Sequence, residues 1–316
     1  MTAVATDTSS DAASTRSRWS FDQLDARLAA VLGAAALGLT GPLIALSGLD
    51  AGTSSLWRAS LAVLLLVAIR FVARRRAVAA GHPAPKRGMS MRITSLAAGV
   101  FLGLDMVLWS QSILAVGAGI ATVVVNVQVI VVPLLSAVLL GERIRRSFWF
   151  VAPVLLGGVA LAGGIVGQQP SSSAVFGTIT GAAAGIAYAG YLLLLRRTSH
   201  EPAHRLANLT DNMIAAALVA LIGCAATGHL TLWPGWAPVA WLFVAAVTGH
   251  VIAWLLVGSA LPRLSASTGS TLLLTLPIFA LAFSAVLLGE RPTASQLAGS
   301  AIVLGAIAVL NRPSSK

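Results

Sequence analysis

The octapeptide SAVLLGER stands at Ser136–Arg143 and again, unchanged, at Ser284–Arg291. The two copies start 148 positions apart (284 − 136), and other residues repeat at the same spacing. The run Gly-Ala-Ala-Ala, for example, begins at Gly33 and recurs at Gly181. An identical eight-residue string is improbable as coincidence, so we interpret the whole chain as a duplication of one ancestral unit.

The composition indicates that this unit belongs in a membrane. Of the 316 residues, 57% are hydrophobic and 10% are charged, whereas soluble domains carry about 25% charged residues. The apolar runs approach 20 residues, the length at which a helix crosses a bilayer. They lack the two-residue alternation of a membrane barrel, and open sheet edges are not viable in lipid. We therefore predict an all-α membrane protein.

The apolar runs and the residues that interrupt them predict ten transmembrane helices in two five-helix repeats. Because five is an odd number, the second repeat enters the membrane from the opposite side and is inverted, as in many secondary transporters. We expect a disordered cytoplasmic tail over residues 1–24, a first repeat over 25–167 and a second, inverted repeat over 168–316. The expected helices are 27–47, 53–72, 92–113, 117–140, 146–167, 174–195, 205–227, 237–259, 264–288 and 294–311.

The basic residues support this topology. With a cytoplasmic amino terminus, 19 of the 21 Lys and Arg residues fall on the cytoplasmic side of the ten expected helices, as the positive-inside rule requires. The expected location is thus the cytoplasmic membrane, with several passes and both termini cytoplasmic. The net charge of +11 is explained by topology, and we expect no nucleic-acid partner. The first octapeptide then faces the cytoplasm and the second faces out.

These features resemble the EamA family of the drug/metabolite transporter superfamily. The resemblance rests on ten spans in two repeats, and on Leu-Leu-Gly-Glu-Arg at the end of the fourth and ninth spans. Pro277 stands thirteen residues before Glu290 of the second motif, where the first half has Val129. The stretch GLDMVLWSQSI and the following GAGIATVVVNVQV are similar to segments of YddG-like amino-acid exporters. The resemblance implies export of amino acids or related metabolites.

One face of the third span carries the first candidate site residues. Asp105 lies near the middle of this span, where a carboxylate costs on the order of 2.5–3.5 kcal/mol to insert and is usually functional. Trp109 follows at four residues and Ser112 at seven, so the three share a helical face. We expect them to line a substrate cavity. The alternative is a structural aspartate bonded to neighbouring helices.

The eighth span carries a similar pair, His250 and Trp254, at four-residue spacing. Histidine titrates near neutrality, so Asp105 and His250 are the candidates for proton coupling. A histidine bonded within the helix bundle is the simpler alternative. Trp109 and Trp254 both lie deep in their spans. Aromatic rings at this depth favour an amphipathic or aromatic substrate.

Further polar residues are expected to line the cavity or to form hydrogen bonds between helices. In the fourth span Thr122 and Asn126 share a face, and we favour Asn126 over Gln128. Arg58, one turn inside the outer end of the second span, is a candidate anion contact at the outer mouth or a snorkelling side chain. Glu142 and Glu290 are expected to pair with the arginine that follows each. The matching polar residues of the ninth span are Ser270 and Thr271.

These observations favour a secondary transporter that moves a small metabolite by alternating access. The preferred function, which the resemblance implies, is export of an amino acid or a related amphipathic compound. Uptake of a vitamin or nucleobase-like metabolite is the alternative, and an intramembrane enzyme is more distant, because no paired carboxylates, metal cluster or nucleophile with its base is visible. The sequence has no phosphate-binding loop for ATP. The expected partners are a small-molecule substrate and the lipid bilayer. We expect no cofactor and no metal, and Cys224 is the one cysteine of the sequence. The sequence does not predict the oligomeric state.

Overall fold

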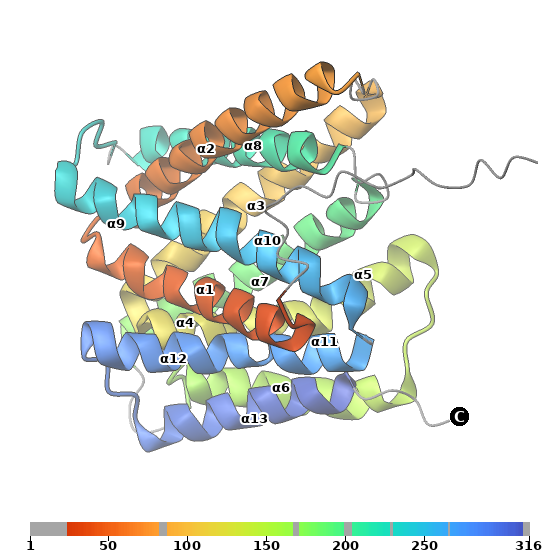
Figure 1. Cartoon of the computed structure of the whole chain (residues 1–316). Helices are drawn as coiled ribbons and strands as arrows, with labels where there is room; N and C mark the ends of the chain where they lie inside the picture. Colours follow the sequence, from red (N-terminus) through yellow and green to blue (C-terminus); the bar gives the residue numbers. More distant parts are fainter. Residues whose placement is uncertain are drawn as a thin grey trace, which may run out of the picture.

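The computed structural model describes residues 24–81, 87–166, 171–198, 204–227, 230–264 and 266–311. The tail expected over residues 1–24 lies outside this part except for Leu24. All regular secondary structure in the described part is helical. In chain order (Figure 1) the α-helices are α1 (Ala26–Leu46), α2 (Ala51–Ala79), α3 (Met89–Val116), α4 (Ala118–Val124), α5 (Gln128–Leu140), α6 (Arg146–Ala162), α7 (Ser172–Thr198), α8 (Arg205–Thr227), α9 (Trp236–Ala246), α10 (Ala253–Ala260), α11 (Ala266–Leu273), α12 (Thr275–Leu288) and α13 (Ala294–Leu310).

Seven helical segments in the described residues are long and apolar enough to cross a membrane. Two of them are composite: α4 and α5 form Ala118–Leu140, and α9 continues through a π-helical turn into α10. The helices α6, α12 and α13 are apolar but shorter. The expected all-helical membrane fold is therefore present. By length, seven helical segments of the described residues are complete spans, where ten were predicted.

Side-chain caps and glycines set several helix ends that hydropathy alone placed differently. Asp50 accepts a hydrogen bond from the backbone N–H of Thr53 and caps the start of α2, two residues before the predicted start. The same helix continues to Ala79, beyond the predicted residue 72, because its arginines favour helix once they leave the apolar layer. Helix α6 ends at Ala162 instead of residue 167, since Gly163 and Gly164 follow and Gly164 has a φ of +76°.

The duplication is visible in the helix bounds. Adding 148 to the bounds of α6 gives 294–310, which are the bounds of α13. The two copies of the octapeptide also end their helices in one way. Gly141 (φ +69°) and Gly289 (φ +67°) are both left-handed, and the next N–H donates to the serine carbonyl six residues back, at 3.3 Å in both copies. This Schellman-type cap is a property of the local sequence.

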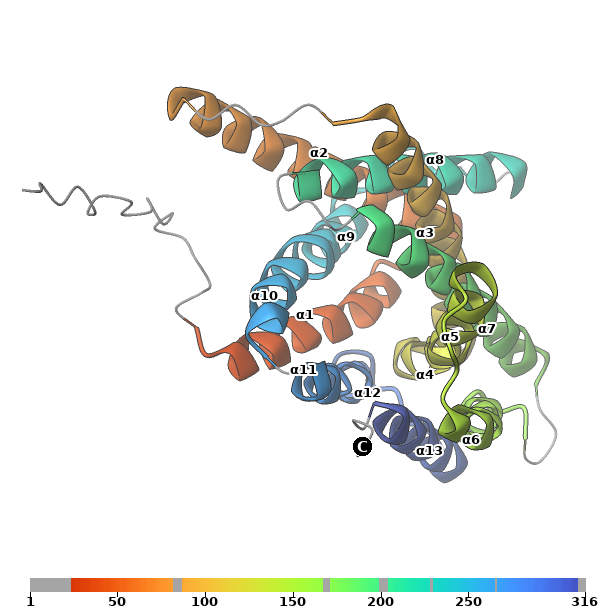
Figure 2. The same cartoon turned by 90° about the vertical axis from the view of Figure 1, so that its right-hand side faces the viewer.

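The two halves interlock. Helix α1 packs against α9, α10 and α12 of the second half, and α7 packs against α3 and α5 of the first half (Figures 1 and 2). Repeat-equivalent helices pack antiparallel: Gly158 of α6 lies beside Ile302 of α13, and Ala162 lies beside Gly299. The halves thus form one body, with each half supplying walls for the other.

Small residues bring the halves close at the contact between α3 and α8. A Cβ added at Gly103 would lie 2.8 Å from the Cα of Ala216, and one at Gly99 would overlap the backbone oxygen of Asn212. Such glycine spacing lets membrane helices approach closely. The GxxxG pattern of the third span therefore serves packing.

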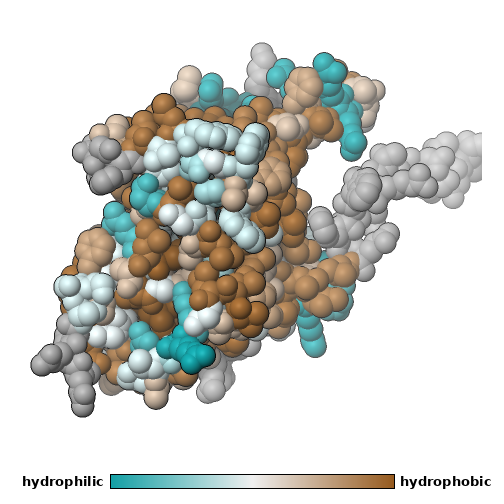
Figure 3. Space-filling model, turned by 90° about the vertical axis from the view of Figure 1, so that its left-hand side faces the viewer, coloured by the Kyte–Doolittle hydropathy of each residue, from teal (hydrophilic) through white to brown (hydrophobic). Residues whose placement is uncertain are grey.

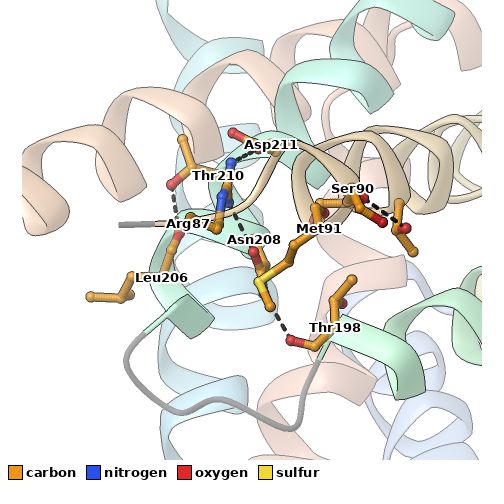
Figure 4. Close-up of polar contacts among 10 residues, drawn as sticks. Arg87, Ser90, Met91, Thr198, Leu206, Asn208, Thr210 and Asp211 are labelled. Atoms are coloured by element: carbon orange, nitrogen blue, oxygen red, sulfur yellow. Dashed lines mark hydrogen bonds and ion pairs between the residues drawn. The ribbon is translucent and has the colours of Figure 1, made fainter. Parts of the chain in front are cut away.

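A polar cluster fastens the same helices at one end (Figure 4). Arg87, just before α3, donates to Asn208 at 2.8 Å and forms an ion pair with Asp211, both on α8. Asn208 also donates to the carbonyl of Thr198 at the end of α7, at 2.8 Å. These groups are largely buried, so they join three helix ends and are not a solvated helix face.

Large apolar side chains cover much of the outer surface (Figure 3). Phe150 is 79% exposed and Val286 is 81% exposed, on opposite repeats. Soluble proteins rarely show apolar patches of this extent, and here they fit contact with lipid tails.

Candidate functional site

The helices surround a cavity of about 810 Å³. Its walls come from both halves of the chain. Of the candidate site residues predicted from the sequence, those that line the cavity are Arg58, Asp105, Trp109, Thr122, Asn126 and His250.

Arg58 is the buried cation of this cavity. Its side chain is 2% exposed, and its Nε and Nη2 atoms have no hydrogen-bond partner among the described residues. The guanidinium carbon lies 5.5 Å from the centroid of the Trp109 ring, a cation–π distance. This burial contradicts the snorkelling alternative, because α2 turns the side chain inward against α3. The anion contact at the outer mouth stays a prediction. Ser55 holds the two helices together by donating to the carbonyl of Met106 at 3.0 Å.

Asp105 brings the opposite charge to the same space. It is 8% exposed and lies near enough to Arg58 to interact electrostatically. In the part of the chain that the structure describes, no ion pair joins the two side chains. A buried charge without a close partner is costly, so the cavity holds two opposite charges that are available to a ligand.

Two tyrosines complete the wall, and the sequence analysis missed them. Tyr188 and Tyr191 of α7 line the cavity, with ring centroids 5.5 Å apart. They are the two tyrosines of the chain, both deep in one apolar run, and that depth is the signal that singled out Trp109. Together with Trp109 they make the cavity wall partly aromatic.

The fourth span is interrupted beside the cavity. A 3₁₀ turn at Val125–Val127 separates α4 from α5, and Asn126 donates its amide to the carbonyl of Thr122 at 2.8 Å. Thr122 in turn donates to the carbonyl of Ala118 at 2.8 Å. Gln128, the first residue of α5, lines the cavity as well, and its Oε1 is buried without a partner among the described residues. Both Asn126 and Gln128 therefore reach the cavity, where only Asn126 was favoured.

His250 lies in a π-helical segment, Val247–Ile252. Segments of π-helix are rare in proteins, and those that occur are often found at functional sites. Gly249 beside it approaches α1 so closely that an added Cβ would be 2.6 Å from the hydroxyl of Thr40. The irregular turn thus places the imidazole on the cavity wall.

The remaining candidates have different outcomes. Ser112 does not line this cavity: it is fully buried and donates to the carbonyl of Gly177 on α7 at 2.7 Å. Ser112 shares a helical face with Asp105, as the residue spacing predicts. However, α7 packs over this face at Ser112. The side chains of Trp254, Ser270 and Thr271 lie outside the described part of the structure. In the described residues, no three His, Cys, Asp or Glu side chains gather where they could hold a metal ion.

Comparison with known proteins places this architecture. The model of the EamA-like transporter family matches residues 26–164 and again residues 175–312. The chain belongs to the EamA-like transporter family. Among solved structures, a chain described as "Crystal structure of protein" is similar in fold, with a TM-score of 0.56 at 18% sequence identity over 90% of this chain and 94% of that chain. None of the curated proteins compared with the chain matches it.

The two ends of the cavity in this EamA-like chain differ. One end opens beside the loop after α5, where Glu142, Arg143 and Arg145 are on the rim. At the other end α4 packs against α12, and the carboxylate of Glu290 accepts the backbone N–H groups of Ala118 and Gly119.

Both glutamates were expected to pair with the arginine that follows each, but the ion pairs of the described residues include neither of these. Glu142 instead contacts Arg196 at 3.1 Å, and Glu290 accepts the two backbone N–H groups at the start of α4.

Proposed function

We propose that this EamA-like protein is a secondary transporter that moves an amino acid or a related amphipathic compound across the cytoplasmic membrane by alternating access, in the direction of export. The observation that carries the proposal is the buried guanidinium of Arg58, whose Nε and Nη2 have no hydrogen-bond partner among the described residues, in a cavity that also holds Asp105.

The chemistry of the cavity supports a zwitterion. An arginine binds a carboxylate through several donors in a fixed geometry, and Asp105 suits an ammonium group. Each charge alone is costly to bury, and a ligand with both charges would offset both costs. Trp109 and the two tyrosines supply flat apolar surface for the rest of the molecule. The family membership favours transport over intramembrane catalysis.

The placement in the membrane is part of this proposal. The helices α6 and α13 have 17 residues each, or roughly 26 Å at 1.5 Å per residue, at the lower limit for a span. With α11 and α12 taken together, ten spans in two inverted repeats follow, as the antiparallel packing of α6 and α13 supports. The basic residues then put both termini and the Glu142 rim on the cytoplasmic side.

Coupling to protons belongs to the same proposal. Asp105 and His250 line one cavity from opposite halves of the chain, so a proton taken up there would be exposed to whichever side the cavity faces. Flux measured with and without a pH gradient tests this: the Asp105→Asn variant is expected to lose any stimulation by the gradient.

The test of the substrate uses purified protein and proteoliposomes. Phenylalanine, leucine and a nucleobase are compared as stabilising ligands, since a ligand raises the melting temperature by mass action. We expect stabilisation by the amino acids. Arg58→Met is expected to weaken their binding on the order of a hundredfold, because hydrogen bonds from a buried charged group to the ligand carboxylate are lost.

Arg74→Met is the matched control, because Arg74 is exposed on the part of α2 that extends toward the cytoplasmic end. It should bind like the unaltered protein. Stabilisation by the nucleobase alone, or equal binding by Arg58→Met, would contradict the proposal.

A further inference from the structure

The second copy of the octapeptide makes a contact that joins the two halves. The Oε1 atom of Glu290 accepts the N–H of Ala118 at 2.7 Å, and its Oε2 accepts the N–H of Gly119 at 3.3 Å. These N–H groups begin α4 and have no partner within their helix. A carboxylate is favoured at this positive end of a helix.

The fit is close. Gly117, just before α4, has a φ of +91°, and a Cβ added to it would lie 2.9 Å from the carboxyl carbon of Glu290. No side chain fits between the glutamate and the start of the helix.

In the described residues the first copy has no equivalent contact. Glu142 is 48% exposed, and the one ion pair that this part of the chain gives it is with Arg196, itself 57% exposed. Such surface pairs contribute little. Yet the repeat supplies an equivalent partner. Adding 148 to Ala118 and Gly119 gives Ala266 and Ser267, where α11 begins.

The two glutamates therefore mark two different ends. Where Glu290 caps α4, the helices α4 and α12 pack together, and Glu290 is not among the residues that line the cavity. Where Glu142 stands free of α11, α5 packs on α7 and makes no extensive contact with α11 or α12 in the described residues, and Glu142 is on the cavity rim.

We propose that Glu290 and Glu142 are alternating latches. In the state described here Glu290 holds its end closed; in the opposite state Glu142 accepts the N–H groups at the start of α11, and Glu290 is released. The inference rests on the alternating-access part of the proposed function and not on its substrate.

The local geometry makes this exchange simple. Both octapeptides already have the same left-handed glycine and the same closing hydrogen bond of 3.3 Å, so neither has to refold when its glutamate changes partner. Inverted repeats exchange roles by rigid movement of one unit against the other. The glutamates act as positioning residues, because they set which end is closed from the ends of the cavity: Glu142 is on its rim and Glu290 does not line it.

The test measures from which side the cavity is reached. A reporter cysteine replaces Val129, which lines the cavity, and the buried Cys224 is replaced by alanine. A membrane-impermeant maleimide is added to inside-out and to right-side-out vesicles, without substrate. The readout is the ratio of labelling from the Glu290 side to labelling from the Glu142 side.

The two glutamates should shift this ratio in opposite directions. Glu290→Gln removes the latch of the described state and is expected to raise the ratio on the order of tenfold, the effect of weakening one charge-assisted contact. Glu142→Gln is expected to lower it. The double variant should return near the starting ratio, and Arg291→Gln, at an exposed neighbour, should leave it unaltered.

A purely structural role would not produce opposite signs. Shifts in one direction for both variants, or no shift for Glu142→Gln, would overturn the latch pair. Glu142 makes only a surface contact, so this variant folds whatever happens to Glu290→Gln. Opposite shifts without amino-acid flux would instead overturn the substrate of the proposed function, and flux without opposite shifts would overturn the latches alone.

Discussion

Ser136–Arg143 and Ser284–Arg291 have one sequence and one local structure, but their surroundings differ. Both end a helix at a left-handed glycine with the same closing hydrogen bond. In the first copy, Glu142 lies at the surface beside Arg196; in the second, Glu290 reaches the start of α4. The difference arises in tertiary packing.

The comparison separates two kinds of information in this chain. The octapeptide determines how its helix ends, because the glycine and the hydrogen bonds lie within six residues. It does not determine what the glutamate contacts, because Glu142 and Glu290 share one local sequence and yet have different partners. Variants that act on one level and not on the other can test this separation.

The largest effect is expected where a buried ion pair fastens the Glu142 end. Arg87→Met would leave Asp211 buried without its partner, which costs about 3 kcal/mol. We expect a clear fall in melting temperature in detergent, measured by intrinsic fluorescence. Arg92→Met, at an exposed arginine of α3, is the control and should melt like the unaltered protein. Equal melting of the two variants would mean that the pair does not fasten α3 to α8.

A smaller loss is expected from Gly117→Ala at the closed end. The backbone of Gly117 has φ +91° and ψ 154°, a region that glycine alone adopts readily, and the new Cβ would meet Glu290 at 2.9 Å. The expected cost is about 2–3 kcal/mol from strain and the weakened cap, read from the melting temperature.

Gly164→Ala provides the comparison for Gly117→Ala. Gly164 also has a positive φ, but its nearest neighbours would lie at 3.7 Å. It should lose only about 1 kcal/mol. If both alanines cost the same, Glu290 contributes nothing to the closed end.

The two octapeptide glycines should respond alike. At both Gly141 and Gly289 an added Cβ would have open space around it, so Gly141→Ala and Gly289→Ala are each expected to cost about 1 kcal/mol, the penalty of a left-handed alanine. Thermal melting of the two variants side by side measures this. A difference above about 1 kcal/mol between them would show that the caps are not independent of tertiary packing.

The sequence predicted most of the fold because membrane helices follow hydropathy and the duplication is explicit. The repeat spacing of 148 predicted which helices are equivalent, and the bounds of α6 and α13 follow it. It could not predict that Arg58 turns inward, because snorkelling and burial need the same long side chain and differ only in which face of α2 meets α3. The cover that α7 provides over Ser112 is likewise a contact between distant segments.

Local irregularities were also beyond hydropathy. A π-helical turn at His250 and a 3₁₀ turn at Asn126 interrupt spans that read as continuous apolar runs. His250 and Asn126 had drawn attention to both places, because a polar side chain inside a membrane is costly and is usually functional. The role that each plays in the cavity depends on the backbone break, which has no simple sequence signal.

The smallest effect is expected at the surface partner of the first octapeptide. Arg196→Met removes the only ion pair that the described residues give Glu142, and because both side chains are about half exposed the stability should change by less than about 0.5 kcal/mol. The melting temperature checks this. A loss comparable to that of Gly117→Ala would mean that Glu142 is already engaged in the described state, and the contrast between the two octapeptides would then be one of geometry without an energetic difference.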